Sequence, residues 1–231
     1  MKRAIFILMV LLCGSVASPE QGKHLFILSG QSNMARLDPD ASFVPALKAA
    51  YEDAQIVVVK DAKSGEPIRR WYKGWRAADG SALTESGDLY DRLMGKVHEA
   101  LATTSFQTVT FIWMQGERDA REGHGEVYET SLQGVFDQLS TDLDRQDINF
   151  VIGRLSDFDM DNARYPHWTM VRDAQVEVAQ GCERCVWVDT DDLNDGVNDA
   201  GKEIKNDLHY SVEGYRVLGQ RFAKAALGLI N

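Results

Sequence analysis

The amino-acid sequence predicts an α/β fold, a three-layer α/β/α sandwich with a central five-stranded parallel sheet. Two observations predict it. Five apolar runs are nearly continuous rather than alternating, which is typical of strands buried on both faces of a parallel sheet. Segments with helical patterns separate these runs, and such alternation of strand and helix favours a parallel sheet covered by helices on both faces.

Each element follows from its own stretch of sequence. The expected strands are LFILS (25–29), IVVVK (56–60), VTFIWM (109–114), INFVIG (148–153) and CVWVD (185–189). The expected helices cover 43–53, 88–103, 126–144, 167–180 and 212–229. In the last of them, Val217, Leu218, Phe222 and Ala226 share one face, as in an amphipathic helix. Two long connections, 61–86 and 189–205, leave the carboxyl ends of strands and are expected to wall a site.

The first 17 residues have the pattern of a signal peptide. Lys2 and Arg3 precede an apolar run at 4–12, and a small-residue cleavage site follows at 15–17. The run is too short for a good membrane span. We therefore expect a single domain at 18–231 that is exported to the periplasm or secreted, with no membrane association after cleavage of the signal.

Charge and cysteine content narrow the class of protein. Removal of Lys2 and Arg3 from the 25 basic residues leaves 23 against 35 acidic residues, a net charge of −12. This charge argues against nucleic acid or an anionic membrane surface as a partner. Cys182 and Cys185 form an even pair in an exported chain, which predicts a local disulfide, with a reduced pair as the alternative.

The stretch HLFILSGQSNMAR (24–36) runs from a strand directly into a small-residue turn that contains Ser32. Such a turn lies at the carboxyl edge of the sheet, where open α/β folds bind their ligands. A serine becomes a nucleophile when a base, normally histidine, lies beside it. Among five histidines, His209 stands on a short polar turn before the amphipathic helix at 212–229, which is a good mount for a base; His124 remains open.

Four motifs resemble the SGNH hydrolases. They are GQSNMA around Ser32, WMQGERDA at 113–120, HWTMVRDAQ at 167–175 and NDLHYSVEGYRVLG near the end of the chain. The similarity runs from about residue 24 to 228. It is greatest to the branch that contains sialate O-acetylesterase-like proteins and the acetyl xylan esterases of carbohydrate esterase family 6.

The resemblance implies a flavodoxin-like sandwich in which Ser32 is the nucleophile and His209 the base, without a metal or other cofactor. It also implies an oxyanion hole built from the Ser32 backbone N–H, a glycine N–H and a polar side chain. Gly87 matches the glycine best, although it also fits a helix cap. Gln115 is our choice for the side chain, although it also fits a glutamine that only satisfies backbone groups at a strand end.

The acid of the triad departs from the family pattern of Asp-x-x-His. Asn206 occupies the acid position, and Asp207 follows it. Three alternatives remain open: Asp207 supports His209, Glu117 approaches from the third motif, or a Ser-His dyad operates with Asn206 orienting the ring. We favour Asp207, although it also fits a solvated turn residue.

The connection at 61–86 carries candidate carbohydrate-binding side chains: Arg69, Arg70, Trp71, Tyr72, Trp75 and Arg76. Aromatic faces stack on sugar rings and guanidinium groups bind hydroxyls or carboxylates, but the tryptophans also fit a role in packing the loop onto the body. The acidic loop at 189–199 offers oxygen ligands for calcium. Its spacing fails the EF-hand pattern, so we expect an ordinary solvated loop and assign no metal site.

These features predict a serine esterase that hydrolyses O-acetyl esters on a carbohydrate such as xylan or sialic acid, through an acetyl-enzyme. Two alternatives stay open. The chain could be a catalytically inactive carbohydrate-binding protein on an esterase scaffold, which the asparagine at 206 suggests. It could also be an esterase or thioesterase for a substrate other than a carbohydrate, which would need an apolar acyl channel. The sequence leaves the oligomeric state undetermined.

Overall fold

The structure is a computed structural model that describes residues 22–82 and 86–230. The predicted signal segment at 1–17 lies outside the described residues. A five-stranded sheet has the order β2-β1-β3-β4-β5, and every neighbouring pair is parallel. Its strands are β1 (His24–Gly30), β2 (Ile56–Ala62), β3 (Thr108–Met114), β4 (Asn149–Gly153) and β5 (Cys185–Val188). The predicted five-stranded parallel sheet is confirmed.

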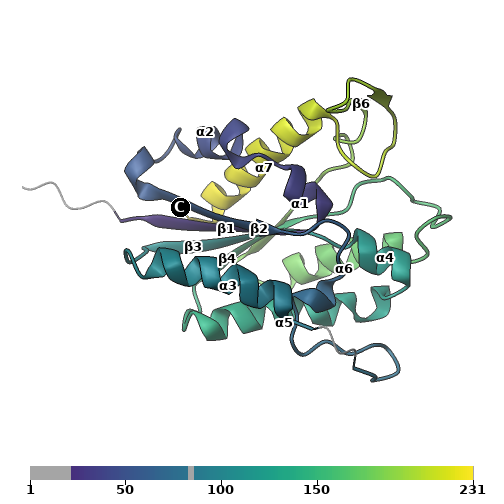
Figure 1. Ribbon diagram of the computed structural model, residues 1–231, viewed down its shortest axis with the longest axis horizontal. Coiled ribbons are helices and arrows are strands. Elements are labelled where there is room, and N and C mark those ends of the chain that lie inside the picture. The colour runs from purple at the N-terminus through teal and green to yellow at the C-terminus, as the bar shows by residue number, and fades with distance from the viewer. Residues whose placement is uncertain (1–21, 83–85, 231) are drawn as a thin grey trace, which may run out of the picture.

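Helices cover both faces of this sheet (Figure 1). On one face lie α2 (Phe43–Leu47) and α7 (Val212–Ile230), which pack against each other. On the other lie α3 (Asp88–Leu101), α5 (Tyr128–Asp142) and α6 (Trp168–Gln180). The three-layer sandwich is therefore confirmed.

Short elements connect the layers. Two short helices follow strands closely. The helix α1 (Ser32–Arg36) comes just after β1, and α4 (Glu117–Glu122) comes just after β3. The 3₁₀ helices are η1 (Pro39–Ala41), η2 (Asp53–Gln55), η3 (Ile68–Arg70) and η4 (Gly125–Val127). A small antiparallel hairpin pairs β6 (Gly196–Val197) with β7 (Glu203–Ile204) inside the acidic loop.

The core lies on both faces of the sheet. All seven residues of β1 are buried. On the α2 face, the Phe26 ring meets Phe43 edge-on at 5.6 Å between centroids, and on the other face Phe111 of β3 meets Phe136 of α5 at 6.0 Å. Burial on both faces explains why the strand sequences are continuously apolar, because neither face of these strands is exposed to solvent where a polar side chain could lie.

The predicted helix at 43–53 is shorter in the structure, because α2 ends at Leu47 and gives way to turns. The physical reason is a tertiary contact that follows: the Tyr51 ring stacks on His24 at the start of β1, with 4.0 Å between centroids. This contact draws the chain away from the helix axis. Helix propensity was therefore overridden by packing against the sheet.

The topology places the ends of β1 and β3 side by side. The chain order reverses at β1, whose neighbours are β2 and β3, and ligands bind outside the carboxyl ends of strands at such a point. Gly30 makes the close approach possible. It has a φ of 143°, and a Cβ there would lie 1.9 Å from the Met114 carbonyl oxygen of β3, so only glycine fits.

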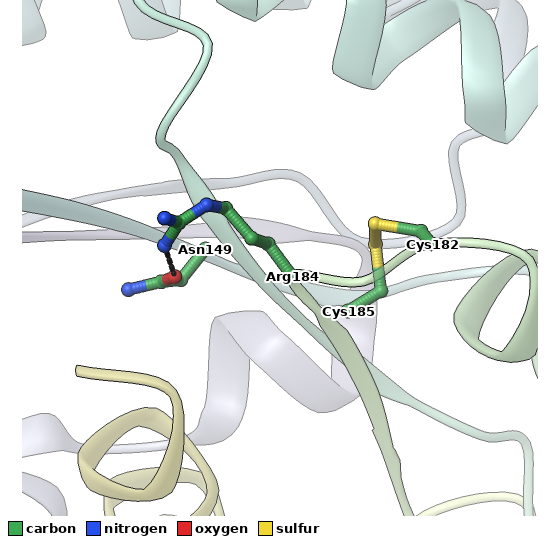
Figure 2. The surroundings of a disulfide bond; sticks show 4 residues. All are labelled: Asn149, Cys182, Arg184 and Cys185. Carbon is green, nitrogen blue, oxygen red and sulfur yellow. Dashed lines mark hydrogen bonds between the residues drawn. A yellow bond between two sulfur atoms is a disulfide. The ribbon is translucent and has the colours of Figure 1, made fainter. Parts of the chain in front are cut away.

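The two cysteines are joined by a disulfide at the start of β5 (Figure 2), as the sequence leads us to expect. Within the same turn, the Arg184 side chain donates a hydrogen bond to Asn149 Oδ1 of β4 at 3.3 Å. The bridge thus holds the turn between α6 and β5 at the amino end of the sheet, away from the ends of the strands that lead to Ser32.

Within the described ranges, no helix is long and apolar enough to cross a membrane. The acidic loop uses its carboxylates in ion pairs with arginines. Arg154 and Arg172 bind Asp191, and Arg221 binds Asp192. Among residues 22–82 and 86–230, no group of histidine, cysteine, aspartate or glutamate side chains is arranged to hold a metal ion.

Candidate active site

Ser32 lies where the sequence leads us to expect it, at the first position of α1 directly beyond β1. The Gln31 backbone N–H donates to the Met114 carbonyl at 2.9 Å, which fixes the turn against the end of β3. The Ser32 side chain is mostly buried, with 7% exposed. The serine is therefore held rigidly at the edge of the sheet.

Ser32 and His209, which lie far apart in the chain, line one pocket of about 300 Å³. Other walls come from Gln31, Gly65 and Glu117. Among the described residues, neither the Ser32 hydroxyl nor the His209 ring makes a hydrogen bond. Catalytic hydrogen bonds in unliganded structures are often long and tighten only when substrate binds, so this arrangement is compatible with a nucleophile and its base.

The surroundings of His209 favour its neutral form. Burial lowers its pKa below the usual value, and the Arg36 cation lowers it further, while Asp207 and Asp199 act in the opposite direction. A neutral imidazole can accept a proton, which a general base must do. The environment therefore suits His209 for the role of base at neutral pH.

Asp207 and Asn206 both shape the loop before His209. One carboxylate oxygen of Asp207 accepts the His209 backbone N–H at 2.9 Å, so this side chain holds the backbone and not the ring. Asn206 adopts a positive φ of 44°, and its Oδ1 accepts from Asn194 Nδ2 at 3.2 Å. The structure thus does not place Asn206 as the group that orients the imidazole.

Glu117 is buried at the first position of α4 and lines the same pocket. Its Oε1 accepts a hydrogen bond from Asn33 Nδ2 at 2.9 Å, and its Oε2 has no partner among the described residues. Burial raises the pKa of Glu117 to about 7. A carboxyl that holds its proton near neutral pH is a weaker partner for an imidazolium than an ionised one.

Asn33 connects the serine turn to the histidine loop. Its Nδ2 also donates to the Leu208 carbonyl at 3.2 Å, directly before His209. Its Oδ1 accepts from the Tyr215 hydroxyl at 2.8 Å. The residue beside Ser32 therefore sets the relative position of both candidate catalytic groups.

The two predicted oxyanion donors besides Ser32 are used elsewhere. Gly87 caps α3 outside the pocket, with a φ of 81°, and its N–H donates to the Arg69 carbonyl at 2.9 Å. This corrects the match with the family glycine and leaves the alternative, a helix-cap glycine. Gln115 is fully buried, and its Nε2 donates to Asp119 Oδ2 at 2.6 Å and to the Glu66 carbonyl at 3.1 Å. Its amide is occupied inside the scaffold.

Two better-placed donors were missed by sequence reasoning. Gly65 follows β2 and lines the pocket, with a φ of 75°. Gln31 also lines it. Its Oε1 accepts from the Arg118 backbone N–H at 3.1 Å and from Gln115 Nε2 at 3.2 Å, while its own Nε2 makes no hydrogen bond within residues 22–82 and 86–230. The signal for Gly65 was present, because a small-residue turn directly follows the second strand as one follows the first.

The predicted carbohydrate-binding tryptophans are core residues. Trp71 is 0% exposed and its Nε1 donates to Ser29 Oγ at 3.0 Å, while Trp75 is 1% exposed. Arg69 is paired with Glu122 at 2.7 Å, and Arg70 with Glu66 and Asp88. None of the four lines the pocket, so the expected aromatic binding surface is corrected to a packed loop.

Other cations and one aromatic side chain surround Ser32 instead. The pocket is lined by Arg36, Arg118, Arg121 and Tyr165. Arg118 is paired with Glu122 through Nε at 2.6 Å. Arg118 lies in the WMQGERDA motif and Arg121 directly follows it, both on α4. Their proximity to Ser32 follows from the adjacency of β1 and β3, which the sequence alone does not reveal.

The comparison with protein families decides the family of the chain. A family model described as carbohydrate esterase, sialic acid-specific acetylesterase matches residues 35–228, most of the chain, including His209. The chain belongs to this family. Membership in this family supports a hydrolase that acts on acetyl esters, and the chain has an SGNH-type fold. A search of curated proteins finds no match.

Solved structures with the same fold cover 90% of this chain. A protein from Arabidopsis thaliana has a TM-score of 0.66 at 19% identity, with 98% of its own chain covered. A structure named NanS has a TM-score of 0.65 at 13% identity, also with 98% covered. A structure described as a novel carbohydrate acetylesterase from Xanthomonas citri has a TM-score of 0.56 at 15% identity, with 56% covered. At these identities the likeness establishes the fold.

Proposed function

We propose that the protein is a serine esterase that removes O-acetyl groups from a carbohydrate. The observation that carries the proposal is the shared pocket of Ser32 and His209 at the carboxyl edge of the sheet, in a chain of an acetylesterase family. Both residues stand in the motifs that resemble SGNH hydrolases, and the pocket is large enough for a small ester.

In the proposed mechanism, the Ser32 hydroxyl attacks the acetyl carbonyl while neutral His209 accepts its proton. The tetrahedral intermediate collapses, the C–O bond to the sugar breaks, and His209 returns the proton to the departing sugar oxygen. A water molecule then attacks the acetyl-enzyme with His209 again as base, which releases acetate and restores Ser32. No cofactor takes part in these steps.

The oxyanion of each tetrahedral intermediate needs donors aimed at it. We assign the Ser32 backbone N–H, which has no intrahelical partner at the first position of α1, and the Gly65 N–H after β2. The Gln31 side-chain amide is a third donor, because its oxygen is already engaged and its nitrogen is unused. Gly65 and Gln31 replace Gly87 and Gln115 in this assignment.

Asp207 supports the imidazolium in this proposal by position and charge. Its carboxylate anchors the His209 backbone and raises the pKa of the ring, which is the direction that stabilises the charged form in the transition state. Glu117 serves the site as a buried carboxyl that accepts a hydrogen bond from Asn33 and so fixes its position. The reading of the protein as an inactive binding scaffold is not favoured, because the asparagine that suggested it belongs to the loop framework.

The substrate that we propose is an acetylated sugar that bears a carboxylate. Arg36, Arg118 and Arg121 bring three guanidinium groups to the pocket, and planar guanidinium groups bind carboxylates well. The matching family is described as sialic acid-specific, which agrees with an acidic sugar. An exported location, periplasmic or secreted, is also our proposal, and the Cys182–Cys185 disulfide fits an oxidising compartment.

The test is release of acetate by the mature protein from O-acetylated sialic acid, acetylated xylan and p-nitrophenyl acetate. Ser32→Ala and His209→Ala should each lower kcat by at least about a thousandfold. Ser140→Ala on α5, away from the pocket, is the matched control and should retain full activity. Folded wild-type protein that releases no acetate from any of the three substrates would refute the proposal.

A further inference from the structure

A second cavity adjoins the candidate active site. It has a volume of about 460 Å³, larger than the pocket of Ser32, and Arg36 lines both. Its other walls come from the acidic loop through Asp199 and from the first turns of α7 through Val212, Tyr215 and Arg216. A volume of this size falls within the range of about 300–1,000 Å³ that is usual for small-molecule sites.

The walls of this cavity combine apolar surface with paired charges. Its surface is mainly apolar, and Val212 contributes an aliphatic side chain that is 57% exposed. At its edges, Arg36 lies 4.0 Å from Asp199, and Arg216 binds Glu213 through its Nε at 2.7 Å. Because cations and carboxylates alternate there, the cavity favours a ligand with apolar faces and neutral hydroxyl groups over an ion or a bare hydrocarbon chain.

One hydrogen-bonded bridge joins the cavity wall to the catalytic groups. Tyr215, which lines the cavity, donates a hydrogen bond from its hydroxyl to Asn33 Oδ1. Asn33 directly follows Ser32 in the chain, and its Nδ2 donates to the Leu208 carbonyl just before His209. The cavity is therefore held at a fixed position relative to the reacting groups. A substrate that reaches from Ser32 past Arg36 would enter it.

We propose that this cavity is a subsite for the sugar unit next to the acetylated one, so that the preferred substrate is a glycan of two or more units. The inference rests on the proposed carbohydrate esterase function. The apolar faces and hydroxyl groups of a pyranose ring match the walls, and the shared Arg36 places the subsite beside the pocket where the ester binds. A long acyl chain would instead leave the charged edges facing hydrocarbon.

The first test compares kcat/KM for O-acetylated sialic acid with that for O-acetylated sialyl-lactose. Wild-type protein should prefer the longer substrate by at least about tenfold, which corresponds to about 1.4 kcal/mol. Val212→Trp, which fills the rim of the cavity, should abolish most of this preference. Val197→Trp is the matched control, because Val197 is similarly exposed at 48% and does not line the cavity, and it should keep the preference.

Equal kcat/KM for both substrates would overturn the subsite, and so would a preference that Val212→Trp leaves intact. A rate that rises along p-nitrophenyl acetate, butyrate and octanoate, and falls with Val212→Trp, would overturn it in favour of an acyl pocket. Calorimetric binding of unacetylated sialyl-lactose and sialic acid separates the subsite from the proposed function. If no acetyl ester is hydrolysed, the subsite is still supported when sialyl-lactose binds more tightly than sialic acid and Val212→Trp removes the difference. Equal binding of the two ligands refutes the subsite.

Discussion

Replacement of Asn33 by alanine tests how the two halves of the active site are held together. Asn33 is 1% exposed and makes three hydrogen bonds, two through Nδ2 to Glu117 and to the Leu208 carbonyl and one through Oδ1 from Tyr215. Asn33→Ala removes all three. We expect it to lower both the free energy of unfolding and kcat, because the serine turn loses its connection to the histidine loop.

The magnitude follows from the groups left without partners. A buried polar group that loses its hydrogen bond costs about 1–3 kcal/mol. The hydrogen bond to the Glu117 oxygen is buried, whereas the bonds with the Leu208 carbonyl and the Tyr215 hydroxyl are part-buried, so water can reach these two groups. The expected loss is therefore about 2–4 kcal/mol, below the stability of about 5–15 kcal/mol typical of a domain, so the variant should still fold.

Urea unfolding and p-nitrophenyl acetate kinetics measure the two effects. The matched control is Asn149→Ala at the opposite end of the sheet, since Asn149 is similarly buried, with 2% exposed, and accepts a hydrogen bond from Arg184 (Figure 2). It should cost stability and leave kcat unchanged. A loss below about 1 kcal/mol for Asn33→Ala together with an unchanged kcat would refute the view that Asn33 couples the serine and histidine segments.

Three further predictions concern charge and covalent structure. Burial raises the pKa of Glu117 to about 7, so its contribution to stability is present below its ordinary pKa of 4.5 and is lost as pH rises through 7. Glu117→Gln should therefore flatten the dependence of Tm on pH between these two values. An unchanged profile would contradict this. Arg36 lowers the pKa of His209, so Arg36→Gln should move the acidic limb of the kcat/KM profile to higher pH, and a shift to lower pH would disprove the coupling. Serine at both Cys182 and Cys185 should cost about 2 kcal/mol, from the entropy of closing so short a loop, and leave kcat unchanged; a large loss of kcat would show that the bridge acts on the site.

The fold was predictable because its main signals are local. Strands buried on both faces must be apolar at every position, so segments such as 109–114 identify themselves without knowledge of their neighbours. The helix at 43–53 was overestimated for the opposite reason. Its end depends on the stacking of Tyr51 on His24, and a contact between distant segments leaves no periodic pattern in the sequence.

The candidate site was also predictable only where the signals are local. Ser32 occupies a turn directly after a strand, and His209 a turn directly before a helix, so local patterns and motifs were enough to place both at the sheet edge. Gly87 was chosen because it stands at a helix start, but the structure brings Gly65 and not Gly87 to the pocket. Trp71 and Trp75 were candidates for sugar binding, with packing of the loop onto the body as the alternative, and their burial agrees with the alternative.

By itself, the sequence determined the α/β class and the five strands, and it pointed to the two residues that we propose carry the chemistry, because each depends on neighbours along the chain. Only the tertiary structure decided which donors remain unused at the pocket. The Gln115 amide donates to Asp119 and to the Glu66 carbonyl, whereas the Gln31 amide nitrogen makes no hydrogen bond among the described residues. A hydrogen-bonding group can serve a substrate only if the fold has not already satisfied it, and that competition is settled between segments that meet only after folding.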